Sequence, residues 1–477
     1  MDDGSDGEAF APEPPNAEET SGLTCEADPS ADFDLAAPLP GDKQQAGQEA
    51  EDGKAAAETP SEMHGPSLVF SGGGDFLSKY RNQRRGEAGK PRLRKKAADA
   101  GPAKPVSAPD RINVQLNSML VHSRHHEKIL QVIESHFDNF NAVNLITALH
   151  RLATVVLSAR KGALRRDVRF KRLIHRLSET LRNSDAGMLK PQDLSNMAWA
   201  LTKLGLLNAV LFGHLSDHIM RTIHNFEPVN LSMTLWAFAR SGFLDEKLFR
   251  AAAIEVKRQL PDFQPQQIAN TTWAMAKSGF VDEEVFLSAA NLALQKLSNF
   301  QPMNFSMLLY SFALAKLPHP KLFEEVGQRC TVEALSSALS APHVVTNLAL
   351  AFSDAGVINN DVFDAIAQVA CSSLHDFRTQ QIATLTQAFA RAEVQHERLF
   401  ASISSAVVMR LAEFKQQDLQ ELLAAYQSLG MSTVAIARAI DAQNLQEQEW
   451  GVNNWMLVLM MLVALLAMLI IWRLRFA

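Results

Sequence analysis

Cysteine is scarce in this chain of 477 residues, which carries only Cys25, Cys330 and Cys371. Three scattered cysteines form no disulfide framework and no CxxC pair of the kind that holds zinc. The sequence therefore predicts a protein of a reducing compartment, in which the thiols are free or buried.

Catalytic signatures are absent from the sequence as well. It contains no P-loop, no GxSxG nucleophile turn, no HExxH zinc motif and no set of kinase motifs. His122, His125 and His126 form a local cluster, but they lack the nearby cysteines or placed carboxylates that would complete a metal site. We expect a protein that binds rather than catalyses, with no metal and no cofactor.

The chain also lacks an excess of positive charge, since its formal net charge is −6. Residues 1–110 hold 21 Asp and Glu against 12 Lys and Arg, whereas residues 111–445 hold 29 against 32. The first ~60 residues have too few large apolar side chains to bury a core, so we expect them to be disordered. They also lack the pattern of a signal peptide, and their acidic residues argue against an organellar transit peptide.

A run of cations follows between Lys79 and Lys96, in sequence that contains glycine and proline. This composition is typical of a flexible basic arm. Nucleic-acid contact, contact with anionic lipid and a nuclear address are all open as its function, and so is a merely solvated linker. We group residues 1–110 as one arm, first acidic and then basic.

What the chain does have is a block of about fifteen residues that recurs with a spacing of 37. Strong copies start at Pro191, Pro228, Pro265 and Pro302. Weaker copies start at Phe140, Pro342, Thr379 and Gln416. A fixed period of this length indicates helix pairs that stack into a solenoid. We predict an all-α solenoid of about eight helix-pair repeats over residues 111–440, followed by a linker at 441–454.

Residues of the unit are counted here from the motif proline, which is position zero. Positions three, seven and ten are largely apolar and form one stripe on a first helix, and position nine is small, which lets a neighbouring helix approach closely. Gly205, Gly242 and Gly279 are expected to end this helix. A Leu-Phe or Val-Phe pair then begins the core of a second helix, and a phenylalanine two residues before the next proline closes the unit.

The segment 455–472 is apolar throughout and reads WMLVLMMLVALLAMLIIW. At a rise of about 1.5 Å per residue it spans about 27 Å, enough for a thin hydrocarbon core. Tryptophans bracket it, and Arg473 and Arg475 follow. We predict a transmembrane tail anchor with the bulk of the protein in the cytosol. The outer membrane of a mitochondrion or plastid is favoured over the endoplasmic reticulum, and a buried core helix is the other interpretation.

Positions one, five, eight and twelve form a second file along each first helix. In the copy from Pro191 they are Gln192, Asn196, Trp199 and Lys203. An amide, an aromatic ring and a cation in one file suit a single-stranded base and its phosphate. In the alternative, the tryptophans pack between repeats and the helix dipole stabilises the cations at the end of the helix. The asparagines then brace the next repeat through a hydrogen bond. The RNA-binding candidates of this file are Gln192, Asn196, Lys203, Arg240, Gln266, Asn270, Lys277 and Asn347.

A second basic element extends from Arg160 to Arg182 and is diluted only by Asp167 and Glu179. Such a density of cations on a helix makes a positive flank that can hold a phosphate backbone. A merely solvated face is the alternative. The RNA-binding candidates of this element are Arg165, Arg166, Arg169 and Arg172.

At the segments WALTKLG, WAFARSG and WAMAKSG the chain resembles the octotricopeptide repeat proteins and the similar heptatricopeptide repeats of alveolate organelles. The resemblance covers roughly residues 140–430 and is strongest over Pro191–Phe323. It implies a helix-pair solenoid that binds organellar RNA and governs its stability, processing or translation. The chain departs from these families in its near-neutral array, its acidic start and apolar end, and the lack of an evident further RNA domain after Gly430.

Two functional hypotheses follow from these observations. In the first, a membrane-tethered helical-repeat protein recognises single-stranded RNA along one face, without catalysis. In the second, a membrane-anchored scaffold binds a protein partner in its groove.

Overall fold

The computed structural model describes residues 108–184, 189–338 and 341–445, together with 460–462, 464, 465 and 468. These residues form helices and their connections, and no strand occurs among them. The predicted all-α class is therefore confirmed for the described part of the chain. The arm predicted for residues 1–110 lies outside the described residues, apart from 108–110.

The helices alternate along the chain between two sets, which we call first and second helices after their order in each unit. The first helices are α2 (Ala108–His122), α4 (Ala142–Val155), α7 (Pro191–Lys203), α9 (Pro228–Ser241), α11 (Pro265–Ser278), α13 (Pro302–Leu314), α16 (Ala341–Asp354), α18 (Thr379–Arg391) and α20 (Gln416–Ser428). The second helices are α3 (His126–His136), α6 (Val168–Asn183), α8 (Ala209–Thr222), α10 (Glu246–Gln259), α12 (Glu283–Gln295), α14 (Pro320–Gly327), α17 (Asn360–Ser373) and α19 (Glu397–Met409). Residues 434–445 form a further helix after α20.

Short elements complete the units. The α-helix α5 (Lys161–Arg166) lies between the first helix α4 and the second helix α6 of one unit. The α-helix α15 (Val332–Ser336) lies between the second helix α14 and the next first helix, α16. Single 3₁₀ turns precede most of the first helices and one precedes α5: η2 (Phe137–Asn139), η3 (Ser158–Arg160), η4 (Ile223–Asn225), η5 (Leu260–Asp262), η6 (Leu297–Asn299), η7 (Leu374–Asp376) and η8 (Leu411–Glu413).

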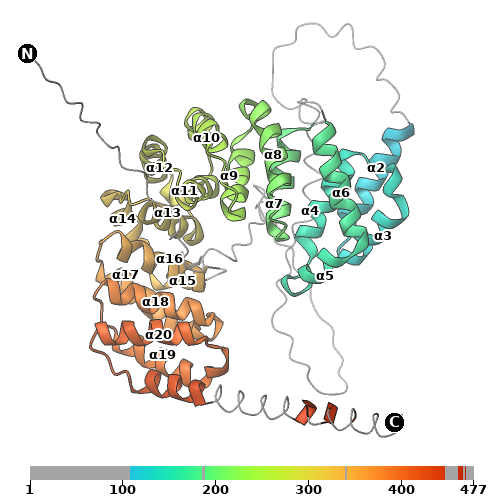
Figure 1. Cartoon of the computed structure of the whole chain (residues 1–477). Helices are drawn as coiled ribbons and strands as arrows, with labels where there is room; N and C mark the ends of the chain where they lie inside the picture. The colour runs from blue at the N-terminus through green and yellow to red at the C-terminus, as the bar shows by residue number, and fades with distance from the viewer. Residues whose placement is uncertain are drawn as a thin grey trace, which may run out of the picture.

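Helices of one set stack side by side. Each first helix packs against the first helices of the neighbouring units, from α2 and α4 through to α18 and α20, and the second helices stack in a parallel row. The stack curves into an arc, with α7, α9, α11, α13 and α16 inside and α8, α10, α12, α14 and α17 outside (Figure 1). The predicted helix-pair solenoid is confirmed. Within the described residues, the pair α2–α3 adds a unit ahead of the first predicted copy.

Local sequence sets both ends of a first helix. In α9, Pro228 takes the first helical position, where its missing N–H leaves no donor unpaired. Asn230 at position two turns back and accepts a hydrogen bond from the Glu227 backbone N–H, with an N to Oδ1 distance of 3.3 Å. Gly242 ends the helix with a φ of 73°, in the left-handed region that glycine adopts without steric cost. The repeated proline, polar residue and glycine therefore fix the bounds of the helix.

An aromatic contact joins most neighbouring units, although the position-ten residue of α11 is Met275 and that of α7 is Leu201. The phenylalanine near the start of a second helix meets, edge to face, the position-ten ring of the following first helix. The ring centroids lie 5.2 Å apart in Phe212–Phe238 and 5.1 Å apart in Phe286–Phe312. The same contact recurs in Phe323–Phe352, Phe363–Phe389 and Phe400–Tyr426. Each pair contributes about 0.5–1.5 kcal/mol beyond its buried area, which fixes one unit against the next.

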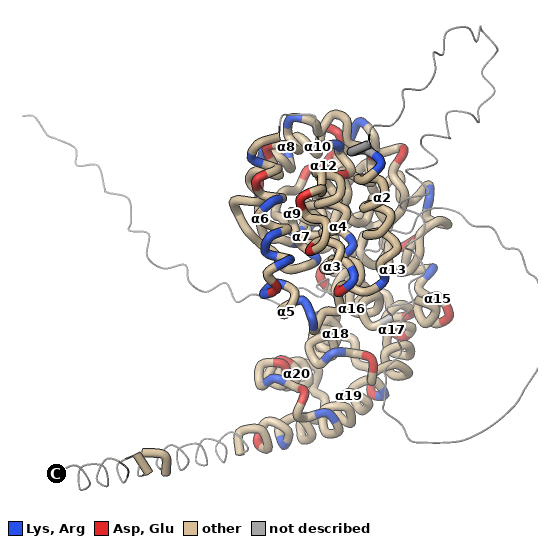
Figure 2. The backbone as a smooth tube through the Cα atoms, turned by 90° about the vertical axis from the view of Figure 1, so that its right-hand side faces the viewer, with Lys and Arg blue, Asp and Glu red and all other residues tan. Residues whose placement is uncertain are grey.

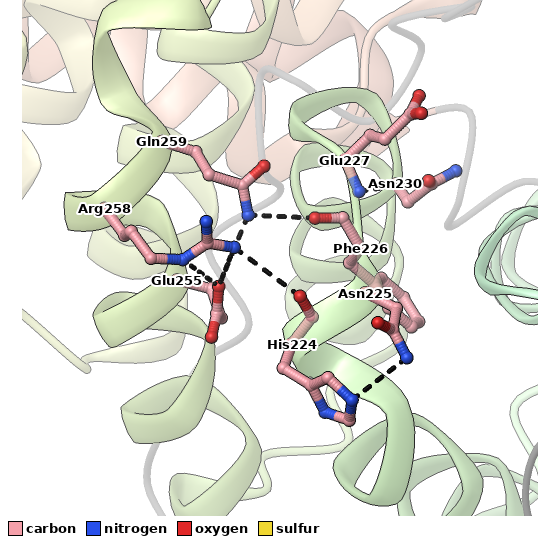
Figure 3. Close-up of polar contacts among 8 residues, drawn as sticks. All are labelled: His224, Asn225, Phe226, Glu227, Asn230, Glu255, Arg258 and Gln259. Carbon is pink, nitrogen blue, oxygen red and sulfur yellow. Dashed lines mark hydrogen bonds and ion pairs between the residues drawn. The ribbon is translucent and has the colours of Figure 1, made fainter.

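The turn that closes a unit is held by the second helix of the following unit. Gln259 of α10 donates from Nε2 to the carbonyl oxygen of Phe226 at 2.9 Å, beside the Arg258–Glu255 ion pair (Figure 3). One unit later, Lys296 donates from Nζ to the carbonyl oxygen of Pro261 at 2.7 Å. Backbone carbonyls in a turn need such partners, because burying them unpaired is costly.

Two places depart from the regular period. The unit that begins at Pro302 extends 40 residues to Pro342, and its second helix is broken into α14 and α15. Between α4 and α6 the short α5 is inserted, where the sequence predicted an expanded basic helix. This insertion brings α5 against the end of α7, which matters for the site described below.

The predicted tail anchor, residues 455–472, falls largely outside the described residues. Only 460–462, 464, 465 and 468 are described within it, and these are helical. Among the described residues no helix has the length and apolar character needed to cross a bilayer.

Among the units from α7 to α20, two lack the glycine that follows the other first helices, which yields a prediction about stability. Lys316 and Glu393 occupy the same register and adopt φ values of 56° and 54°. A side chain in this conformation costs about 1 kcal/mol, a cost that glycine avoids. Lys316→Gly should therefore raise the free energy of unfolding by roughly 0.5–1 kcal/mol, measured as a higher midpoint in urea. The reciprocal variant Gly356→Lys should lower the midpoint, and a shift of the same sign in both variants would contradict this account.

Candidate nucleic-acid interface

The tryptophans at position eight belong to the packing between units. Trp199 and Trp236 are 4% exposed and Trp273 is fully buried. The Trp236 and Trp273 ring centroids lie 6.4 Å apart, and those of Trp199 and His150 lie 5.0 Å apart. His150 is the equivalent residue of α4 when that helix is counted from Ala142, its first residue. The rings therefore close the gap between neighbouring first helices. A base cannot stack on them without separating those helices.

The asparagines at position five are buried beside the tryptophans. Asn196 and Asn270 are 5% and 7% exposed, and Asn347 is fully buried. Neither Oδ1 nor Nδ2 of Asn347 has a hydrogen-bond partner in the described part of the chain, and Oδ1 of Asn270 has none either. The predicted bracing of the next repeat is thus not made by Asn347. Burial also keeps its side chain away from RNA in this conformation.

Side-chain hydrogen bonds between repeats are made instead by residues at position two, a position that the predicted file does not include. Asn230 donates from Nδ2 to Oγ of Ser195 in the preceding first helix at 3.2 Å. Thr379 donates from Oγ1 to Oδ2 of Asp418 in the following one at 2.9 Å. The sequence does contain evidence for this role, because position two is polar in most copies. Those residues are Asp193, Asn230, Gln267, Asn304, Gln381 and Asp418.

Cations gather where α5 meets the ends of α7 and α9. Lys203 and Arg240 lie in the last turns of α7 and α9. Arg165 of α5 donates from Nη1 to the carbonyl oxygen of Gly205, at 3.0 Å. Burial lowers the pKa of the Lys161 ammonium below its ordinary value, and the nearby charges of Arg165 and Arg240 lower it further. We call Lys161, Arg165, Lys203 and Arg240 the basic corner.

The basic corner is built by the backbone as well as by its charges. Gly205 follows α7 with a φ of +68°, and a Cβ at this residue would lie 2.9 Å from Nη1 of Arg165. The glycine thus gives the guanidinium room to reach the carbonyl. Lys203 lies two residues earlier and is half-buried, which lowers the pKa of its ammonium to about 8. The mutual repulsion of Lys161, Arg165 and Arg240 favours an anion among them.

The arginines of α6 have a different role. Arg169 lies 2.8 Å from carboxylate oxygens of both Asp167 and Glu127, and these hydrogen bonds raise the pKa of its guanidinium. Arg172 pairs with Asp138 at 3.1 Å and stacks over the Phe137 ring, 4.2 Å from its centroid. Both side chains therefore tie α6 to α3 and the turn after it. Their charge is already neutralised in part, which weakens them as phosphate ligands.

The remaining predicted residues lie at both ends of the first helices and on α5. Gln192 and Gln266 are half-buried at the starts of α7 and α11, whereas Lys277 is exposed at the end of α11. Arg166 is exposed on α5. In Figure 2, Lys and Arg are drawn blue and are frequent on α5 and α6. The structure therefore brings Arg165, Lys203 and Arg240 together, places Arg166 and Lys277 on accessible surface, and buries Asn196, Asn270 and Asn347.

This arrangement suits an anionic chain better than an isolated base. The cations stand at the helix ends and are half-buried or exposed, while the asparagines and tryptophans of the file are buried. Phosphate groups are met by Arg and Lys without regard to base identity. Among the described residues no group of His, Cys, Asp and Glu is placed to hold a metal ion.

The fold and this surface define a helical-repeat solenoid with a cationic corner on its inner edge. Residues 150–341, about two-fifths of the chain, match the sequence model of the family described as RNA-editing substrate-binding complex 6 protein. The matched segment runs from α4 to the start of α16 and contains the whole basic corner. No curated protein matches the chain. The match and the stacked helix pairs fit an RNA-associated helical-repeat protein, while the resemblance to octotricopeptide repeats stays a prediction.

The lowered pKa of Lys203 yields a prediction on stability and pH. Its folded pKa of about 8 lies below the ordinary 10.5, so the charged lysine destabilises the fold below pH 8. This cost disappears as the pH rises from 8 through 10.5. Lys203→Met should therefore raise the free energy of unfolding at pH 7 by about 1 kcal/mol, a discounted figure because the side chain is only half-buried.

The matched control is Lys277→Met, which changes an exposed lysine at the same position of another unit. Lys277→Met should leave the urea midpoint unchanged at pH 7 and above pH 10.5. Equal midpoints for Lys203→Met and wild type at pH 7, or an advantage of the variant that persists above pH 10.5, would contradict the assignment.

Proposed function

We propose that this chain is an RNA-binding helical-repeat protein that holds single-stranded RNA along the inner edge of its solenoid, without catalysis. The observation that carries the proposal is the basic corner. Cations from α5, α7 and α9 converge there, although the sequence separates them by up to 79 residues, from Lys161 to Arg240. The corner lies inside the segment that matches a family described by its place in an RNA-editing substrate-binding complex.

In this proposal the phosphate backbone supplies most of the affinity. Lys161, Arg165, Lys203 and Arg240 meet the first phosphates, and Lys277 extends the path by one unit toward α13. Neighbouring helices in such a stack stand about 8–10 Å apart, close to the span of one to two nucleotides of extended strand. The near-neutral charge of residues 111–445 limits nonspecific attraction elsewhere, so the corner sets where the RNA enters.

Base recognition, in this proposal, uses the half-buried amides at position one rather than the buried asparagines. Gln192 and Gln266 lie at the opposite end of the first helices from Lys203 and Lys277. The two ends are eleven residues apart on α7, or about 16 Å at a rise of about 1.5 Å per residue, so the base and phosphate contacts come from different nucleotides of the strand. The chain thus presents RNA to partner proteins, in keeping with a substrate-binding role in an RNA-processing assembly.

We further propose that residues 455–472 tether this RNA-binding surface to a membrane. The support is the sequence alone: the segment is free of charge, bracketed by Trp455 and Trp472, and followed by Arg473 and Arg475. The favoured membrane is the outer membrane of a mitochondrion or plastid, with the solenoid in the cytosol.

Charge reversal at position twelve tests RNA binding. The triple variant Lys203→Glu, Arg240→Glu, Lys277→Glu should weaken binding to a single-stranded RNA pool by at least tenfold, because three phosphate contacts become repulsive. The slope of log affinity against log salt should also fall by about two, measured by fluorescence anisotropy at several salt concentrations. The control is Lys247→Glu, Lys321→Glu, Arg398→Glu, an identical charge change on exposed residues of the second helices.

The two triple variants separate local from global electrostatics. Equal weakening in both would mean that net charge rather than the inner edge binds RNA. Crosslinking of the wild-type protein in cells that recovers no RNA above background would refute the proposed function altogether.

Removal of residues 455–472 tests the tether. The truncated protein should move from the carbonate-resistant membrane pellet to the soluble fraction, because the apolar segment that favours hydrocarbon is gone. Its RNA affinity in solution should stay unchanged, which makes the two parts of the proposal independent. Retention in the membrane pellet after truncation would show that another part of the chain holds the protein there.

A further inference from the structure

Large aliphatic side chains stand exposed at one register of the turns between first and second helices. Leu207, Leu244, Val281 and Ile358 all occupy position sixteen of their units and are 58%, 56%, 37% and 51% exposed. The units stack side by side, so the turns of Leu207, Leu244 and Val281 form a row along one edge of the solenoid. Ile358 follows beyond the unit from Pro302, which carries Pro318 at this position. We call these four residues the turn strip.

The turn strip differs from the ordinary scatter of apolar residues on a protein surface. Other exposed aliphatic residues, such as Val210, Ile254 and Leu287, occupy registers that hold charged or polar residues or glycine in the neighbouring units. Single exposed aliphatic residues need no explanation, but a row that recurs with the repeat marks an interaction surface.

Cations accompany the turn strip. Lys203, Arg240 and Lys277 precede Leu207, Leu244 and Val281 by four residues each, at the same end of α7, α9 and α11. The edge therefore alternates a positive charge with an aliphatic side chain in three consecutive units. Its complement is a segment that carries acidic residues and spaced apolar side chains, and that has no cations of its own.

This chain contains such a segment outside the described residues. Residues 23–40 read LTCEADPSADFDLAAPLP, with four acidic residues, no Lys or Arg, and three leucines and a phenylalanine. Residues 1–22 are a poorer match because Phe10 is their one large apolar residue after Met1, and residues 41–62 contain no large apolar residue and two lysines. We propose that residues 23–40 dock on the turn strip of the same chain.

The spacing of the segment matches that of the turns. Phe33, Ala36 and Leu39 are three residues apart, which in a polyproline II conformation would put them on one face at a spacing of about 9 Å. Stacked helices stand about 8–10 Å apart, so successive apolar side chains meet successive turns. Asp32 and Asp34 flank Phe33 and face the cations that precede the strip. The chain between residues 40 and 108 can span more than about 200 Å when extended, so its length allows this contact.

The docking of residues 23–40 does not depend on the proposed RNA binding, although both use the cations Lys203, Arg240 and Lys277. It is therefore tested on the full chain in detergent, with nucleic acid removed. Amide hydrogen exchange of residues 23–40 is compared with that of a synthetic peptide of the same sequence. In parallel, a carbodiimide joins carboxylates to lysines in direct contact, and mass spectrometry identifies the joined residues.

Docking predicts that residues 23–40 exchange at least tenfold more slowly in the full chain than in the free peptide. The joined pairs should link Asp32 or Asp34 to Lys203 or Lys277. The variant Leu207→Ser, Leu244→Ser, Val281→Ser should abolish both effects. The control Val210→Ser, Ile254→Ser, Leu287→Ser changes equally exposed aliphatic residues off the strip and should preserve them.

A second variant, Phe33→Ser with Leu39→Ser, removes the apolar side chains from the segment without touching the solenoid, and it should also abolish protection. Exchange of residues 23–40 at the rate of the free peptide in the wild-type chain would overturn the proposal. So would links that form only between differently isotope-labelled copies, because they would show a second copy as the occupant.

Discussion

The structure depends on contact between neighbouring first helices, which no single unit can supply for itself. Each first helix also packs against the second helix of its own unit, but most of its contacts are with the first helices on either side. The edge-to-face ring pairs, such as Phe212–Phe238, set the distance and register of that contact. Helix bounds, turns and inner surface all follow from this constraint, because a unit that slipped along its neighbour would lose its ring pair and its carbonyl partners together.

Close stacking also decides which residues are free to bind. The small residues at position nine let first helices approach until Trp236 and Trp273 touch, and this closes the file that they share with Asn270. Accessible polar groups are then left at the ends of the helices. The cations at position twelve stand there, and α5 adds Lys161 and Arg165 to them. The insertion that interrupts the regular period is therefore the feature that concentrates charge, because it brings a second basic element against the array.

The repeated block predicted most of the fold, and it did so for local reasons. Proline at the first helical position, a polar residue at position two and glycine after the last turn specify a helix from the nearest neighbours in sequence. The candidate site was predicted less well. Asn347 and Lys203 occupy the same kind of file, yet Asn347 is buried without a partner and Lys203 reaches the basic corner. Arg169 and Arg165 lie four residues apart, yet one is held by two carboxylates and the other meets the carbonyl of Gly205.

By itself, then, the sequence determined that the described chain forms helix pairs, where each first helix begins and ends, and which side chains are apolar. It could do so because these features depend on contacts within a few residues. Only the tertiary structure decided which polar side chains are accessible, which cations meet across α5, α7 and α9, and that the position-sixteen residues form a row. Those outcomes depend on how closely one helix approaches the next and on the curvature of the stack. Both are set by packing between units, which the one-dimensional pattern does not contain.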